Sequence, residues 1–317
     1  MRDTPAPIFI FSTPRTRSNL LARLLETHPR TGNSILYPLR AAYCAGIERP
    51  IPDSSVFATR KINEEETFQF AYDKLKQRLT EDQDEGLVPL VKDHILMATL
   101  PSVINSYCNR SLKEGLGCII DPDGDNGFQF NDSTPEEVTN STCLPEVFLY
   151  RIIPVITIRD PIRATASAMG IMLRSLGATL DEANLEASCT FKWSRLLFDY
   201  YGAKGGPAPI VVDGDKLVKD PQGQMKKLCE LIDIDESGIQ YTWEARIQVQ
   251  NEEMHEDVFM GVLHRSTGVI RGNDAPLDLE EEVKNWEDEW GTEVAETMRG
   301  YVERSMEDYQ YLRQHAI

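Results

Sequence analysis

Positive charge is scarce in this sequence. The 317 residues include 33 Lys and Arg against 51 Asp and Glu, which gives a formal net charge of −18. A surface with this balance repels polyanions, so nucleic acids and anionic membranes are excluded as main partners. Long apolar runs are also missing: none approaches the ~18 residues of a membrane span, and no secretory-type segment opens the chain. We therefore expect a cytoplasmic protein.

Metal-ligand spacings are missing as well. The six cysteines include no CxxC pair, which excludes the common zinc motifs and favours buried free thiols in a reducing compartment. Residues 121–132 begin with the aspartate spacing of a calcium loop, but Asn126 and Asp132 stand in place of its glycine and glutamate. A solvated turn explains that segment better, and we expect no metal ion.

The pattern of apolar residues indicates an α/β protein. A hydrophobic content of 41% and a charged content of 26% are ordinary for a soluble globular chain. Short apolar runs alternate with helical patterns, which predicts βα units and a mostly parallel central sheet flanked by helices. Strands are expected at 7–11, 87–91, 153–158 and 209–212, and helices at 18–28, 66–79, 161–175, 181–201, 221–232 and 279–312.

Two segments do not fit this alternation. Residues 30–65 and 101–150 carry scattered Pro, Gly, Asn and Asp without a clear period. We expect one domain over residues 1–317, with these two segments as lid-like insertions over the carboxyl edge of the sheet. Ligands of α/β folds bind at that edge.

The first segment with chemical potential is IFIFSTPRTRSNLL, residues 8–21. An apolar run leads through a short polar loop with Arg15 and Arg17 into an amphipathic helix. Cations are unfavourable at the start of a helix unless an anion sits among them. The helix N–H groups and the hydroxyls of Thr16 and Ser18 would add donors for that anion. No GxxxxGK[ST] motif is present, and a surface loop with exposed arginines is the alternative.

Two further strand ends carry polar side chains. VITIRDPIRATAS ends a predicted strand at Arg159, and Ser167 follows eight residues later. LVPLVKDH delivers Lys92 and His94 to one side of another strand, because side chains alternate along it. The alternatives are an ordinary surface ion pair for Arg159, with Asp160 or another acid, and a purely structural histidine.

These segments together resemble the sulfotransferase family, which transfers a sulfuryl group from 3′-phosphoadenosine 5′-phosphosulfate (PAPS) and releases PAP. STPRTRSNLL (12–21) is similar to the family's 5′-phosphosulfate loop, and RDPIRATAS (159–167) to its 3′-phosphate motif. KDH (92–94) is similar to the Lys-Thr-His segment that carries the catalytic base. IVVDGDKLVKDP (210–221) resembles a later stretch of the family, in which a strand leads into a 'YEDL…DP' segment and a helix comes after it.

The resemblance implies a P-loop-like fold and assigns roles to individual residues. His94 would take the proton of the acceptor, Arg15 would neutralise the charge on the leaving oxygen, and Lys92 would touch the sulfuryl group or the base. The cofactor would be held by Arg15, Thr16, Ser18, Arg159 and Ser167. The acceptor would be a hydroxyl or an amine of a small molecule, and no metal is required.

Departures from the family pattern leave alternatives open. Arg17 and Asn19 stand where the family has Gly and Thr or Ser, and both remain candidate cofactor ligands. A late segment, HRSTGVIRGND, offers Arg265, Arg271 and Gly272 as residues that close over the nucleotide. The altered loop is also compatible with a non-catalytic protein of the same fold that binds PAP or another nucleotide, either as a sensor or as a partner-binding module. A kinase is disfavoured, because no Walker lysine is present. The sequence fixes no oligomeric state.

Overall fold

The fold is described from a computed structural model of the chain. It describes residues 5–52, 54, 61–111, 119, 138–180, 183–206, 208–245, 254–271 and 275–317. The segment proposed as a calcium-like turn, residues 112–118 and 120–137 of segment 101–150, and Gly272 lie outside these ranges. Within them no helix is long and apolar enough to cross a bilayer.

A parallel sheet forms the centre of the described structure, which confirms the predicted fold class. Its order is β2-β3-β1-β4-β5, and every neighbouring pair is parallel. β1 lies between β3 and β4, so the strand order reverses at β1, and α/β folds bind ligands at the carboxyl edge of such a point. The strands are β1 (Ile8–Ser12), β2 (Ile35–Leu36), β3 (Leu90–His94), β4 (Ile153–Ile158) and β5 (Ile210–Asp213).

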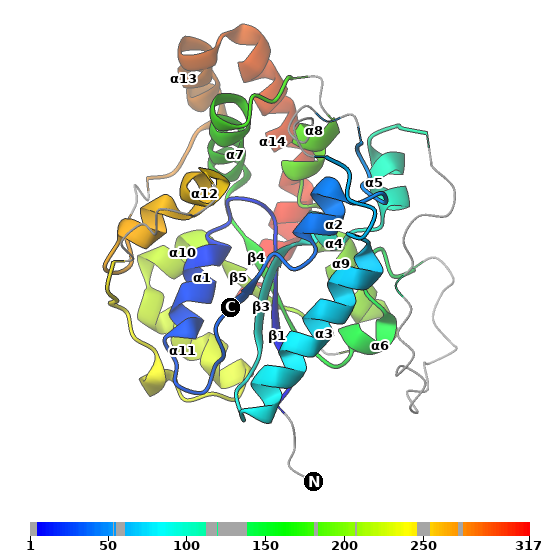
Figure 1. The fold of residues 1–317 in the computed structure, drawn as a ribbon. Helices are drawn as coiled ribbons and strands as arrows, with labels where there is room; N and C mark the ends of the chain where they lie inside the picture. The colour runs from blue at the N-terminus through cyan, green and yellow to red at the C-terminus, as the bar shows by residue number, and fades with distance from the viewer. Residues whose placement is uncertain are drawn as a thin grey trace.

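Two helical layers cover the sheet. Ile8 and Ile10 point from β1 toward α1 (Ser18–Glu26), α10 (Gly214–Lys219) and α11 (Pro221–Leu231). Phe9 and Phe11 point the other way, toward α3 (Phe68–Asp84) and α9 (Lys192–Lys204). Figure 1 shows the two groups on opposite sides of the strands. This double burial explains why β1 is apolar from Ile8 to Phe11 instead of alternating.

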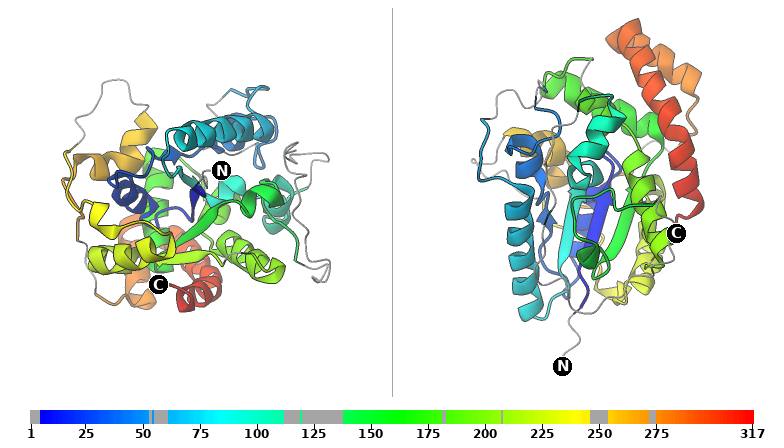
Figure 2. Two further views of the ribbon diagram at one scale, coloured as in Figure 1. Left: turned by 90° about the horizontal axis from the view of Figure 1, so that it is seen from below. Right: turned by 90° about the vertical axis from the view of Figure 1, so that its right-hand side faces the viewer.

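The C-terminal part adds a helical hairpin, α13 (Leu279–Trp290) and α14 (Thr292–Gln314), which packs against α7 (Pro161–Ser175). In the side view of Figure 2 the hairpin projects beyond the end toward which the strands point. The single helix predicted for 279–312 is wrong, because Gly291 with φ 89° separates the two helices.

Other boundaries also differ from the sequence predictions. The strand predicted at 87–91 is β3, which starts at Leu90, because Pro89 has no N–H for the hydrogen-bond ladder of the sheet. Lys92 and His94 therefore lie within β3 itself. The helix predicted at 181–201 is α8 (Ala183–Ser188) and α9, separated where Thr190 accepts a hydrogen bond from the Lys192 N–H. Part of segment 30–65 is the edge strand β2, so this segment extends the sheet as well as flanking it.

The remaining elements are α2 (Arg40–Ala45), α4 (Ile95–Ala98), α5 (Pro101–Tyr107), α6 (Glu146–Leu149), η2 (Glu236–Gly238) and α12 (Met254–Arg265).

Candidate active site

The loop between β1 and α1, residues 13–17, has an unusual backbone. Arg15 and Arg17 have φ values of 67° and 64°, in the left-handed region that favours glycine. A residue with a side chain costs ~1–2 kcal/mol in this conformation. Strain of this kind persists only where neighbouring contacts fix the backbone.

Thr16 supplies such contacts. Its side chain is fully buried, and its hydroxyl lies 2.7 Å from the Thr13 carbonyl oxygen and 2.7 Å from the Thr157 hydroxyl. Gly214 approaches so closely that a Cβ there would lie 2.4 Å from the Thr16 carbonyl oxygen. The Thr16 hydroxyl, which we expected to face an anion, instead donates its single proton inside the protein.

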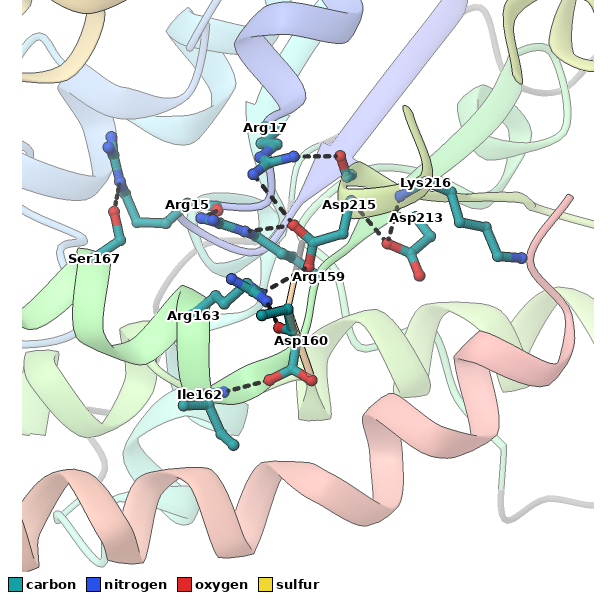
Figure 3. Close-up of polar contacts among 12 residues, drawn as sticks. Arg15, Arg17, Arg159, Asp160, Ile162, Arg163, Ser167, Asp213, Asp215 and Lys216 are labelled. Atoms are coloured by element: carbon teal, nitrogen blue, oxygen red, sulfur yellow. Dashed lines mark hydrogen bonds and ion pairs between the residues drawn. The ribbon is translucent and has the colours of Figure 1, made fainter. Parts of the chain in front are cut away.

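Three arginines surround the carboxylate of Asp215 in the first turn of α10, as Figure 3 shows. Arg17 approaches Asp215 to 3.3 Å and also donates to the Gly214 carbonyl oxygen at 3.1 Å. Arg159 donates through Nε to Asp215 at 3.1 Å, and Arg163 lies 3.8 Å from its other oxygen. The loop, the residue after β4 and α7 each contribute one guanidinium. We call Arg17, Arg159, Arg163 and Asp215 the arginine cluster.

Arg15 points away from this cluster toward α7. Its Nε donates to the Ser167 hydroxyl at 2.8 Å, and its carbonyl oxygen accepts from Arg159 Nη1 at 3.2 Å. Burial lowers the pKa of the Arg15 guanidinium. The structure therefore brings together Arg15, Arg159 and Ser167, which the sequence placed on two separate segments. Asp160, the partner considered first for Arg159, instead caps α7 by accepting from the Ile162 N–H at 2.9 Å.

His94 lies at the same sheet edge, in register with Ser12 of β1. Its Nδ1 is 2.9 Å from the Ser12 hydroxyl, which itself donates to the Asp93 carbonyl oxygen at 3.0 Å. Because the hydroxyl has one proton, Nδ1 must carry the proton of the imidazole and Nε2 must hold the lone pair. Burial first, and the Lys92 charge second, lower the His94 pKa well below 6.5.

Lys92 is fully buried beneath this edge. Its ammonium lies 3.6 Å from the centroid of the Tyr37 ring, and among the described residues Nζ has no hydrogen-bond partner. Burial lowers the pKa of Lys92, while the neighbouring Asp93, whose own pKa is raised by burial to about 7, opposes that shift. Asp93 extends to the opposite face and accepts from the Leu39 N–H at 2.9 Å.

The first turn of α1 contains Ser18 and Asn19. Ser18 is buried, and the Asn19 side-chain oxygen accepts from the Tyr37 hydroxyl at 3.1 Å. The Leu20 N–H already donates to the Arg17 carbonyl oxygen at 3.0 Å, so the N–H groups of Ser18 and Asn19 are the ones that this end of α1 offers to an anion at the loop.

The late segment lies apart from the arginine cluster. Arg265 and Arg271 line an open groove with residues 218–222 of α10 and α11. Ala275 lies at α7, where its carbonyl oxygen accepts a hydrogen bond from Arg163 Nη2 at 2.6 Å. The structure thus connects this segment with the site through Arg163, while it places Arg265 and Arg271 at the neighbouring helices.

Sequence reasoning missed Asp215, Arg163, Gly214 and Tyr37. Tyr37 directly follows the end of β2, and Asp215 lies two residues after the end of β5, so their position at the carboxyl edge was the available signal. In the described ranges no group of three His, Cys, Asp or Glu side chains is arranged to hold a metal ion.

Comparison with known proteins shows what the chain is similar to. The model of a family described as the sulfotransferase family matches residues 7–237. Sulfotransferase ppzF of Metarhizium majus is 25% identical over 342 aligned residues, which cover 98% of this chain and 96% of the relative. Sulfotransferase ppzF of Metarhizium rileyi is 25% identical over 335 residues, covering 98% and 95%.

Proposed function

Because the chain belongs to the sulfotransferase family, we propose that it transfers a sulfuryl group from PAPS to a hydroxyl or an amine of a small molecule. The arrangement of cations supports PAPS as the donor. The 3′-phosphate would lie at Arg159 and Ser167, and the 5′-phosphosulfate at the loop and the first turn of α1. Arg15 contacts both regions, since it belongs to the loop and donates to Ser167.

The observation that carries the proposal is the Lys92 ammonium. A buried amino group without a hydrogen-bond partner is costly, because it has lost its water and gained no acceptor. Burial lowers the pKa of Lys92 for that reason, and an anion at Nζ would stabilise its charged form. Lys92 lies on the same face of β3 as His94. A sulfuryl group between His94 and the loop would supply oxygens for Nζ, which a nucleotide lacking that group would not.

The residues around this point have the properties that sulfuryl transfer needs. PAPS supplies the sulfuryl group, whose S–O bond to the 5′-phosphate breaks as the acceptor forms a new bond to sulfur. His94 Nε2 takes the acceptor proton, for which its neutral imidazole is suited. The Ser12 hydroxyl holds Nδ1–H and so orients the ring. Arg15 stabilises the negative charge that develops on the leaving oxygen.

Binding of PAP tests the proposal before any acceptor is known. PAP should stabilise the protein in a thermal-shift assay more than ADP, ATP or GTP does. Arg159→Ala should weaken the affinity for PAP by roughly ten- to hundredfold, because that is the contribution of a charge-assisted hydrogen bond. The affinity for AMP should fall much less. Arg174→Ala, at the far end of α7 where Arg174 pairs with Glu289, is the matched control and should leave both affinities unchanged.

Two results would contradict the proposal. A wild-type protein that binds ATP more tightly than PAP would exclude PAPS as the donor. Equal losses of PAP and AMP affinity in Arg159→Ala would show that Arg159 does not recognise the 3′-phosphate.

A further inference from the structure

Tyr37 has a backbone that needs an explanation. It follows directly after the edge strand β2 and has a φ of 54°, in a region that a tyrosine rarely adopts. Two backbone hydrogen bonds hold it there: its N–H donates to the Lys92 carbonyl oxygen at 2.7 Å, and its own carbonyl oxygen accepts from the Arg40 N–H at 3.1 Å. The turn therefore places the Tyr37 ring over β3.

The ring is the contact that locates the Lys92 ammonium. Nζ lies 3.6 Å from the ring centroid, and a cation over an aromatic face is attracted by the ring quadrupole. The ring leaves the N–H bonds of the ammonium without oxygen acceptors, since Nζ has no hydrogen bond within the described residues. A cation–π contact thus fixes the position of the charge and keeps its donors available.

The same ring contacts two other parts of the site. Its centroid is 5.1 Å from that of the His94 imidazole, and its hydroxyl donates to Asn19 at 3.1 Å. Burial raises the pKa of Tyr37 to about 12, so the hydroxyl stays protonated and serves as a donor. Tyr37 therefore has a ring function, toward Lys92, and a hydroxyl function, toward α1, that can be separated by mutation.

We infer that Tyr37 is a positioning residue for sulfuryl recognition, whose ring holds the Lys92 ammonium where it donates to the sulfuryl oxygens. The inference rests on the proposed function, because it needs PAPS as the ligand. It concerns the difference between PAPS and PAP, which is the sulfuryl group alone. The ring of Tyr37 carries this role, and the hydroxyl does not.

The test is to measure the affinities of PAPS and PAP by calorimetry for four proteins. Tyr37→Leu removes the ring face and should weaken PAPS by roughly tenfold, as loss of a well-placed charge-assisted bond does, while PAP changes less than about threefold. Tyr37→Phe keeps the face and should retain the wild-type ratio of the two affinities. Tyr311→Leu removes a different cation–π contact, with Arg195 at 3.3 Å, and serves as the matched control.

A double-mutant cycle separates positioning from a general structural effect. In a Lys92→Met background the ammonium is gone, so adding Tyr37→Leu should not change the PAPS-to-PAP affinity ratio further. The inference is overturned if Tyr37→Leu weakens PAPS and PAP equally, if Tyr37→Phe loses the ratio too, or if wild type binds both equally. Failure of the wild type to bind either ligand would instead refute the proposed function, and this inference with it.

Discussion

Replacement of Asp215 by asparagine should move stability and cofactor affinity in opposite directions. The Asp215 carboxylate lies 3.1 to 3.8 Å from the guanidinium nitrogens of Arg17, Arg159 and Arg163. Asparagine keeps one oxygen acceptor for Arg159 and removes the negative charge. The three arginines then repel one another without a carboxylate, while the proposed 3′-phosphate meets a more positive surface.

The two effects have estimable sizes. The side chains involved are 16 to 26% exposed, so water screens each ion pair in part. Pairs of this kind contribute ~0.2–1 kcal/mol each, and the free energy of unfolding should fall by about 1–2 kcal/mol. Two unit charges ~4 Å apart in water interact by about 1 kcal/mol, and a phosphate carries roughly 1.5 to 2 charges. Removing the repulsion should therefore tighten PAP binding by about 1–2 kcal/mol, roughly five- to thirtyfold.

Calorimetric titration of PAP and AMP, with thermal unfolding of the same samples, measures both effects. AMP lacks the 3′-phosphate and should gain little. Asp199→Asn, which removes the carboxylate of the Arg195 pair on α9, controls for net charge. Added salt should reduce the gain, since it screens the charges. Weaker PAP binding by Asp215→Asn would refute the reasoning and show that the carboxylate mainly holds Arg159 in place.

Three further predictions concern the loop and the base, and each needs only purified variants and, for turnover, an acceptor. His94→Asn should lower kcat by roughly 10²–10⁴-fold and leave PAP affinity unchanged. Because burial lowers the His94 pKa, a pH–rate profile of the wild type should show activity falling only below pH 6.5. A fall that begins above neutrality would contradict this role of His94. Ser12→Ala should lower kcat roughly ten- to hundredfold through misorientation of the imidazole, with PAP affinity as the control; an unchanged kcat would show that Ser12 does not orient the ring. Arg17→Gly should change the free energy of unfolding by less than about 2 kcal/mol, because the relief of backbone strain offsets the lost contact with Asp215. The loss of one positive charge from the arginine cluster should weaken PAP by less than about tenfold, and a larger loss would mean that Arg17 holds the cofactor directly.

Local patterns in the sequence predicted the elements that carry the site. Helix α7 begins at Pro161 as predicted, since proline suits the first helical position and Asp160 caps the helix. The β1–loop–α1 unit was predictable from an apolar run followed by leucines at helical spacing. Both signals lie within a few residues, so no tertiary information was required.

The partners of these residues were not predictable in the same way. Asp215 is 56 residues from Arg159, and its role depends on the approach of α10 to the loop at Gly214. Tyr37 is defined by the short strand β2, two residues long, which no periodicity could reveal. The break at Gly291 did have a local signal, because glycine often ends a helix, and the apolar stripe on both sides obscured it.

Arg15 and Arg17 precede the N-terminal end of α1 and belong to two parts of the site with different electrostatics, the proposed phosphosulfate region and the proposed 3′-phosphate region. Arg15 and Lys92, which face the proposed phosphosulfate, form no ion pair with any carboxylate in the described parts of the chain. The arginine cluster at the proposed 3′-phosphate already contains Asp215. The phosphosulfate half therefore has cations without a direct carboxylate contact, although the charge of Asp93 acts on its neighbour Lys92, whereas the 3′-phosphate half holds arginines that an internal carboxylate contacts directly. Such a division would make the affinity for PAPS depend most on the sulfuryl group. The Asp215 carboxylate, which takes no part in the transfer, would set how tightly the 3′-phosphate is held.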